Sequence, residues 1–311
     1  MFIGATILPM LGAIPFIKVF RDAFIGDVNN EVAFGLVFTI GVAITSIPVI
    51  SKIFFDMGIM NTHFSNTVLT VSTFQDLCLW ILLNVATRIA AAGEIELIDL
   101  LIVVCVTLGL FIVTKLISDH MHVRKLKLKA DTFYTISFVV LLYTCAELYR
   151  IGINIMYTSF LIGYLVKSFL GDADDDETKK RMKTLGDFVF SFFVPIYFAL
   201  VGIQLDLIHD FSLFRFIFFF VIAFGLEAIG TLLFLQFTNL NLKTKINFAI
   251  TMNARGGPGI VLATVAYSYK IISVEFFTVL ILTTMLSSLI AGYWLRRQQK
   301  LDADIFMNLT K

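Results

Sequence analysis

Charged residues are scarce in this sequence, and their scarcity sets the class of protein. Only 15% of the 311 residues are Asp, Glu, Lys or Arg, whereas a soluble protein of this length has about a quarter. Hydrophobic residues make up 58% of the chain and gather in runs long enough for a helix to cross a bilayer. The composition therefore predicts an all-α polytopic membrane protein.

Cysteine, histidine and net charge are also low, and each excludes a class of function. Cys78, Cys105 and Cys145 stand in apolar runs without metal-site spacing, so we expect packed thiols. His120 and His122 could bind a metal, but a connecting loop is the simpler interpretation. A net charge of +1 gives no sign of the basic surface that binds nucleic acid. Because no nucleophile–base pair is visible, we expect neither an enzyme nor a resident cofactor.

Short polar connectors divide the chain into about ten predicted transmembrane helices, and no soluble domain is visible. Lys and Arg are about three times as frequent in the connectors on one side, which predicts that both termini are cytoplasmic. The acidic run at 172–177 is expected in a solvated connector on that side. The predicted spans are 2–20, 33–54, 66–87, 99–118, 132–147, 152–170, 186–204, 214–238, 246–268 and 273–295.

The second span contains a proline in the stretch "GVAITSIPVISKIF". Pro48 lacks a backbone N–H and clashes with the preceding turn, which predicts free carbonyls near Ile44 and Thr45. In lipid, free carbonyls are tolerated only where they line a cavity or meet a protein partner. Thr45 and Ser46 are therefore candidate cation ligands. The alternative is a kink that neighbouring hydroxyls satisfy.

The second span from the end is interrupted more strongly, in "MNARGGPGIVLATVAY". Glycines and a proline so close together cannot hold a straight helix, and a buried arginine accompanies them. A plain kink is again the alternative. The residues of this break are Asn253, Arg255, Gly256, Gly257, Pro258 and Gly259.

The two breaks occupy matching places when the spans are counted from the two ends of the chain. The two spans would run in opposite directions, as they do in inverted repeats. Paired broken helices in inverted repeats indicate an ion site at the middle of the membrane in secondary transporters. We therefore expect the breaks to cross side by side, with their helix ends placing partial charges around a cation.

Three acids in the predicted spans are candidate functional residues. Asp76, which follows Gln75 in the third span, is a candidate carrier of a proton or cation, because an ionisable group in the bilayer is unfavourable unless it has a function. A structural ion pair is the alternative for Asp76. Glu227 is either a partner of Arg255 or of a hydroxyl, or a second carrier. Glu147, also expected to be buried, is either structural or lines an outward funnel.

Four stretches, in order along nearly the whole chain, carry a resemblance to a known family. They are "TSIPVISKIFFDMGIMNTHFSNTVLTVSTFQDLCLWILL", "AELYRIGINIMYTSFLIGYLV", "FVFSFFVPIYFALVGIQLDL" and "MNARGGPGIVLATVAYSYKII". They resemble the cation:proton antiporter-2 family of bacterial sodium/proton antiporters, glutathione-gated potassium efflux proteins and plant cation/proton exchangers. By this resemblance, Glu147 of the present sequence matches a glutamate that is characteristic of the family, whereas Glu227 stands where the family usually has a lysine.

The resemblance implies a transporter that exchanges Na⁺ or K⁺ for protons by alternating access. Since Gln75 cannot titrate, Asp76 would be the single carrier at its site, and exchange would be electroneutral. Two alternatives are left open: a passive cation channel, and a truncated membrane protein that does not transport. The sequence does not choose between the two cations.

The resemblance also implies a domain plan. The family has leading helices that help to form a homodimer, and this chain starts at what resembles the first core helix. We therefore expect a chain that is N-terminally truncated relative to the family, with an incomplete dimer interface. The expected parts are a first core repeat (1–95), panel and interface helices (96–210), a second core repeat (211–296) and a short cytoplasmic tail (297–311).

Overall fold

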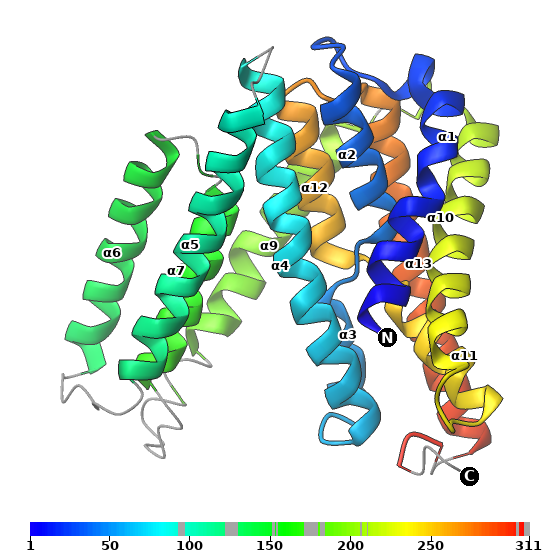
Figure 1. Ribbon diagram of the computed structural model, residues 1–311. Coiled ribbons are helices and arrows are strands. Elements are labelled where there is room, and N and C mark those ends of the chain that lie inside the picture. Colours follow the sequence, from blue (N-terminus) through cyan, green and yellow to red (C-terminus); the bar gives the residue numbers. More distant parts are fainter. Residues whose placement is uncertain are drawn as a thin grey trace. The chain divides into compact units, whose positions relative to one another are not determined.

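The computed structural model describes residues 1–92, 97–121, 130–150, 153, 155–170, 180, 184–205, 207–209, 211–302 and 305–307 (Figure 1). Within these residues the regular structure is helical, apart from one isolated antiparallel bridge between Ile25 and Ile272. The all-helical prediction is therefore confirmed for the described chain.

The chain divides into two compact units, which we call the core unit (Met1–Glu94 with Leu205–Lys311) and the second unit (Ile95–Gln204). The core unit contains η1 (Ile3–Ile7), α1 (Leu8–Phe24), α2 (Glu31–Ala43), α3 (Ile47–Asp56), α4 (His63–Ala92), α10 (Leu213–Leu235), α11 (Leu242–Met252), α12 (Gly256–Ser268) and α13 (Val274–Leu301). The second unit contains α5 (Leu97–Met121), α6 (Ala130–Arg150), α7 (Ile155–Leu170), η2 (Val189–Phe193) and α9 (Val194–Ile203).

Polar side chains fix where helices of the core unit begin. At five helix starts, the side-chain oxygen of an Asn or Ser accepts a hydrogen bond from an N–H of the first turn. Such N–H groups lack a partner within the helix, and lipid offers them none. The capping residues are Asn30 of α2, Ser46 of α3, Ser212 of α10, Asn241 of α11 and Ser273 of α13.

Two aromatic clusters fill opposite ends of the core unit. In the first, Phe24 at the end of α1 stacks on Phe276 at the start of α13, with ring centroids 4.5 Å apart. Phe38 of α2 packs into the same cluster, 5.6 Å from Phe276. In the second, Phe54 near the end of α3 meets Phe64 at 5.8 Å. The break between α2 and α3 therefore lies between the two clusters.

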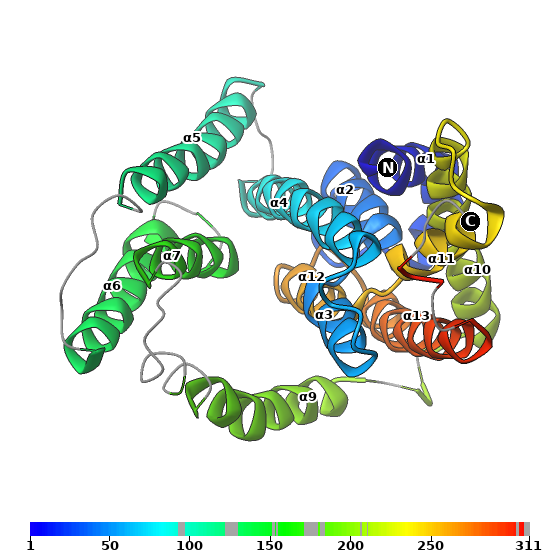
Figure 2. The same ribbon diagram turned by 90° about the horizontal axis from the view of Figure 1, so that it is seen from below.

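The helices of the core unit surround this break. Seen from below, α2 lies between α4 and α1, and α12 runs beside α13 (Figure 2). The helix α10 packs against η1, α1 and α11. In the second unit, α7 packs against both α5 and α6, and α6 leaves Phe138 and Tyr143 exposed. An exposed apolar helix face of this kind is typical of contact with lipid.

Among the residues that the structure describes, six helices are long and apolar enough to cross a membrane, which is fewer than the ten expected. The expected span 246–268 is divided into α11 and α12, each shorter than the ~20 residues that a crossing needs. In the expected spans 99–118, 152–170 and 186–204, only the shorter apolar stretches Leu108–Ser118, Tyr157–Val166 and Thr184–Phe193 could be assessed for crossing, although α5 itself is 25 residues long. Ten spans are therefore not confirmed. The six candidates among the described residues are Ile3–Phe24, Glu31–Asp56, His63–Ala91, Thr132–Arg150, Leu213–Leu235 and Val274–Leu301.

The contact between η1 and α10 depends on two glycines. A Cβ on Gly230 would meet the carbonyl oxygen of Gly4 and would lie 3.2 Å from Cδ of Pro9. Small residues allow membrane helices to approach closely, and their backbones pack here without side chains between them.

We expect Gly230→Ala to lower the free energy of unfolding by about 1–3 kcal/mol, because the added methyl group overpacks this contact. Gly225→Ala on the same helix is the matched control, since a Cβ there has no atom within 4 Å. This change should be neutral or stabilising by up to ~1 kcal/mol. Thermal unfolding in detergent measures both. Equal melting temperatures for the two variants would contradict the packing described here.

Candidate functional site

The two helix breaks meet inside the core unit. The first separates α2 from α3 at residues 44–46, and the second separates α11 from α12 at residues 253–255. The backbone N–H of Ser46 donates a hydrogen bond of 2.6 Å to the carbonyl of Ala254, which joins the two breaks directly. The expectation that the breaks lie side by side is confirmed. That they belong to inverted repeats stays a prediction.

Four helix ends converge at this crossing. The C-termini of α2 and α11 bring partial negative charge, and the N-termini of α3 and α12 bring partial positive charge. The end of α2 presents three carbonyls, those of Gly41, Val42 and Ala43, and each accepts a hydrogen bond from a side chain. At the start of α12, the N–H of Gly256 donates to Oγ of Ser288 at 3.0 Å.

Arg255 is the central cation of the crossing, with a side chain only 1% exposed. Its guanidinium donates to the carbonyls of Gly41 and Val42, both at 2.9 Å. It also forms an ion pair of 3.0 Å with Glu227 of α10. The planar guanidinium can satisfy several acceptors at once, which a lysine ammonium does less well. Arg255 therefore ties the end of α2 to the start of α12 and to α10.

Glu227 is fully buried and has partners on both carboxylate oxygens. Oε2 accepts from Arg255, and Oε1 lies 3.0 Å from the Thr45 hydroxyl. That hydroxyl also lies 2.7 Å from the carbonyl of Met252, so its one hydrogen serves two acceptors. The predicted contact between Glu227 and Arg255 is confirmed. A role for Glu227 as a second carrier stays a prediction.

Gln75 has its orientation set by two carbonyls. Its amide nitrogen donates to the carbonyl of Ala43 and, at 3.2 Å, to that of Ala5. The amide nitrogen is the donor in both contacts, because a carbonyl can only accept. The side-chain oxygen Oε1 is buried and has no hydrogen-bond partner among the described residues. Gln75 thus offers a fixed oxygen inside the core unit.

Asp76 is the next residue on α4, and its surroundings differ from those of Glu227. Its side chain is 8% exposed, and Oδ1 has no hydrogen-bond partner in the described parts of the chain. It borders a small cavity of about 10 Å³, roughly the volume needed to hold one water molecule. Ile44 of the first break and Pro258 of α12 also line this cavity. Asp76 therefore lies beside both broken helices and forms no ion pair with the residues that the structure describes.

The helix breakers act differently from the sequence-based expectation. Pro48 does not bend a continuous helix: it lies in the first turn of α3, where its missing N–H would be unpaired anyway. At the end of α2, the carbonyls of residues 41–43 also lack helical partners, and side chains from other helices bind them. Pro258 similarly lies in the first turn of α12.

Gly256 is required by its conformation and by its neighbours. Its φ of +41° favours glycine, and a Cβ there would collide with Ser46 and Val49. Gly257, by contrast, has open space where a Cβ would point. The close approach of the two breaks therefore depends on Gly256. Asn253 lies inside the crossing as expected, and its side-chain amide donates a hydrogen bond to the carbonyl of Ala249.

One expected buried acid is exposed. The side chain of Glu147 is 41% exposed and forms an ion pair with Arg150 three residues further along α6. The prediction that Glu147 is buried is therefore wrong, because a helical neighbour on the same surface pairs with it in place of a buried partner. The acidic run 172–177, His122 and the side chain of His120 lie outside the described residues.

Two features of the crossing were missed by sequence reasoning. Ser288 of α13 caps the start of α12, and the carbonyl of Ala5 in η1 holds Gln75. A serine in an apolar helix has no spacing signal, and a backbone carbonyl is present at every residue. Neither contact could be found without the fold.

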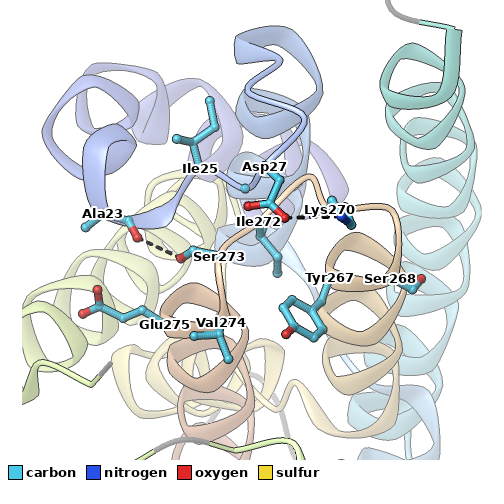
Figure 3. Close-up of a pocket in the computed structure, with 11 residues that line it drawn as sticks. Ala23, Ile25, Asp27, Tyr267, Ser268, Lys270, Ile272, Ser273, Val274 and Glu275 are labelled. Carbon is cyan, nitrogen blue, oxygen red and sulfur yellow. Dashed lines mark hydrogen bonds and ion pairs between the residues drawn. The ribbon is translucent and has the colours of Figure 1, made fainter. Parts of the chain in front are cut away.

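A larger pocket of about 560 Å³ lies elsewhere in the core unit, where α1 ends and α13 begins (Figure 3). Its acids already have partners. Asp27 lies 3.5 Å from Nζ of Lys270, and Glu275 accepts from Nε of Arg215 at 2.7 Å. Because these charges compensate one another, the pocket lacks the unpaired carboxylate that distinguishes Asp76.

Comparison with known proteins agrees with this geometry. A family model described as "Sodium/hydrogen exchanger, transmembrane" matches residues 3–298. The chain belongs to this family. The match covers the crossing, Asp76 and Glu227, so the resemblance indicated by the sequence motifs is confirmed for this exchanger family.

Three relatives of this chain have names that agree with the family. The "Na(+)/H(+) antiporter NhaS4" of Synechocystis sp. is 24% identical over 186 residues, which is 58% of this chain and 43% of the relative. The "K(+)/H(+) antiporter 1" of Saccharomyces cerevisiae is 22% identical over 290 residues, 89% of this chain and 32% of the relative. The "Na(+)/H(+) antiporter" of Enterococcus hirae is 22% identical over 273 residues, which is 85% of this chain and 68% of the relative. The chain thus spans less than half of the first two relatives.

We expect Glu227→Gln to lower the free energy of unfolding by about 3–5 kcal/mol, because it leaves the buried Arg255 charge unpaired. Glu147→Gln removes the same charge from an exposed ion pair. This variant should change the free energy of unfolding by about 0.5 kcal/mol or less. Thermal unfolding in detergent compares the two variants. If Glu227→Gln melts like the unsubstituted chain, Arg255 does not depend on Glu227 for its charge balance.

Proposed function

We propose that this chain exchanges a monovalent cation, Na⁺ or K⁺, for protons across a membrane, with Asp76 as the carrier. The observation that supports this most strongly is the contrast between two buried acids. Glu227 has a fixed cation in Arg255, whereas Asp76 forms no ion pair with the described residues. A carboxylate inside a membrane without such a partner is stabilised by a bound proton or metal cation.

The surroundings of Asp76 support a cation small enough to be bound by oxygens. The side-chain oxygen of Gln75, the preceding residue, is buried and has no hydrogen-bond partner within the described part of the chain. Oxygen atoms are the ligands that hard cations prefer. The helix ends at the crossing add carbonyl dipoles and N–H dipoles close to Asp76. The names of the relatives include both Na⁺ and K⁺, so the proposal keeps both cations.

Charge balance supports electroneutral exchange. Asp76 with a bound proton and Asp76 with a bound monovalent cation carry the same net charge of zero. Glu227 and Arg255 together also carry no net charge. If the core unit alternates between the two sides of the membrane, it then moves no net charge in either loaded form.

We expect Asp76→Asn to abolish exchange, because the amide keeps the size of the side chain and loses its charge. Gln75→Ala should weaken exchange without abolishing it, since it removes one oxygen ligand and two hydrogen bonds to backbone carbonyls. The measurement is a cation-driven pH change in proteoliposomes, with Na⁺, K⁺ and Li⁺ tested in turn. Glu147→Gln is the matched acid control and should keep full exchange. Full exchange by Asp76→Asn would remove Asp76 from the mechanism.

We also expect exchange to be insensitive to membrane potential. If one net charge moved per cycle, 100 mV would change the driving force by about 2.3 kcal/mol. The same proteoliposomes, clamped at zero and at 100 mV inside-negative with a potassium ionophore, should give equal rates of Na⁺-driven pH change. A rate that follows the imposed potential would mean that a second titrating group, such as Glu227, takes part. A steady current without proton exchange would indicate a passive channel.

A further inference from the structure

A groove of about 690 Å³ lies between α3 and α13 in the core unit. Val49 and Ile53 of α3 form one side, and Ile53 approaches α13 at Gly292, where a Cβ would lie 3.5 Å from its Cδ1. On α13, Leu289 is 68% exposed and Tyr293 is 71% exposed. The groove therefore has an apolar lining on both helices.

One end of this groove is basic. Arg296, Arg297 and Lys300, in the last turns of α13, line it and are exposed. Arg296 lies 3.4 Å from Asp56, which Lys52 also contacts at 2.6 Å. Within the described residues, Arg297 and Lys300 form no ion pair with a carboxylate. The groove thus combines an apolar length with a positive end, where Arg297 and Lys300 have no carboxylate partner among the described residues.

The length of the groove matches one leaflet of a bilayer. Met285 and Arg296, which both line it, are eleven positions apart on α13, a rise of about 16 Å. Half of the hydrocarbon core of a bilayer is about 15 Å thick. An acyl chain beside Met285 and Leu289 would therefore place its phosphate close to the basic end.

We propose that an anionic phospholipid binds in this groove, with an acyl chain between α3 and α13 and its phosphate on Arg297 and Lys300. Charge complementarity selects this occupant, because basic pockets at helix ends bind anionic head groups and a zwitterionic lipid gains less from them. The guanidinium of Arg297 can hold two phosphate oxygens at once.

The bound lipid would contact residues that hold the crossing together. Ser288 lines the groove and accepts the hydrogen bond from the N–H of Gly256. Val49, on the opposite side, packs so closely on Gly256 that a Cβ there would collide with it. Filling the groove therefore supports α3 and α13 at the point where α12 begins, and should stabilise the core unit.

Basic residues at the end of a membrane helix also complement its dipole and orient it in the bilayer. That role requires neither a groove nor a particular lipid, and it predicts no preference between dissolved lipids. The two roles are therefore separable in detergent solution.

The test uses the whole chain purified in detergent, with dioleoyl phosphatidylglycerol or dioleoyl phosphatidylcholine added in equal amounts. Native mass spectrometry measures bound lipid, and thermal unfolding measures stabilisation. We expect phosphatidylglycerol to bind and to raise the melting temperature, and phosphatidylcholine to do neither. Arg297→Gln with Lys300→Gln should weaken phosphatidylglycerol binding about thirtyfold, at about 1 kcal/mol for each basic residue.

Lys180→Gln with Lys243→Gln is the charge-matched control, since both lysines are exposed and lie outside the groove. It should bind phosphatidylglycerol like the unsubstituted chain. Gly292→Leu, which narrows the groove and leaves its charges in place, should weaken binding as well. Equal binding of the two lipids, equal loss in both double variants, or full stabilisation by inorganic phosphate alone would each overturn the proposal.

Discussion

The core unit depends on the hydrogen bonds and the ion pair that the guanidinium of Arg255 forms. A helix that ends inside a membrane leaves carbonyls that lipid cannot satisfy. Arg255 satisfies two of those at the end of α2, and Gln75 satisfies a third. The arginine charge in turn requires a buried anion, and Glu227 supplies it. The break in α2–α3, the break in α11–α12 and the acid on α10 are therefore one connected network.

This network explains why two buried acids can have different tasks. Glu227 is held by Arg255 and Thr45, so its removal affects the scaffold of the crossing. Asp76 lies on α4, outside that ion pair, beside a small cavity that both broken helices border. A carrier must be able to exchange its partner, and a carboxylate that forms no ion pair with the described residues meets this requirement. Glu227 stands where the resemblance implies a lysine. Its negative charge is compensated by Arg255 in the break between α11 and α12.

Close packing around the crossing couples it to more distant surfaces. Gly256 allows α12 to begin against Ser46 and Val49, and Ser288 connects that point to α13. The aromatic clusters at the two ends of the core unit hold the same helices in place. A ligand in the groove between α3 and α13 would therefore act on the helices that form the crossing, although it does not touch Asp76.

The sequence by itself determined the membrane class, the two breaks, and the acids in apolar runs, because these follow from composition and local backbone chemistry. Helix breakers and buried charges are visible one residue at a time. Only the tertiary structure decided which groups meet: Arg255 with the carbonyls of α2, Ser288 with Gly256, and Glu147 with Arg150 on an exposed face. It also showed that Pro48 lies in the first turn of α3. The exact place of this break depends on side chains from other helices, which bind the carbonyls at the end of α2. Such partners are far apart in the chain, and their pairing is fixed by packing rather than by sequence spacing.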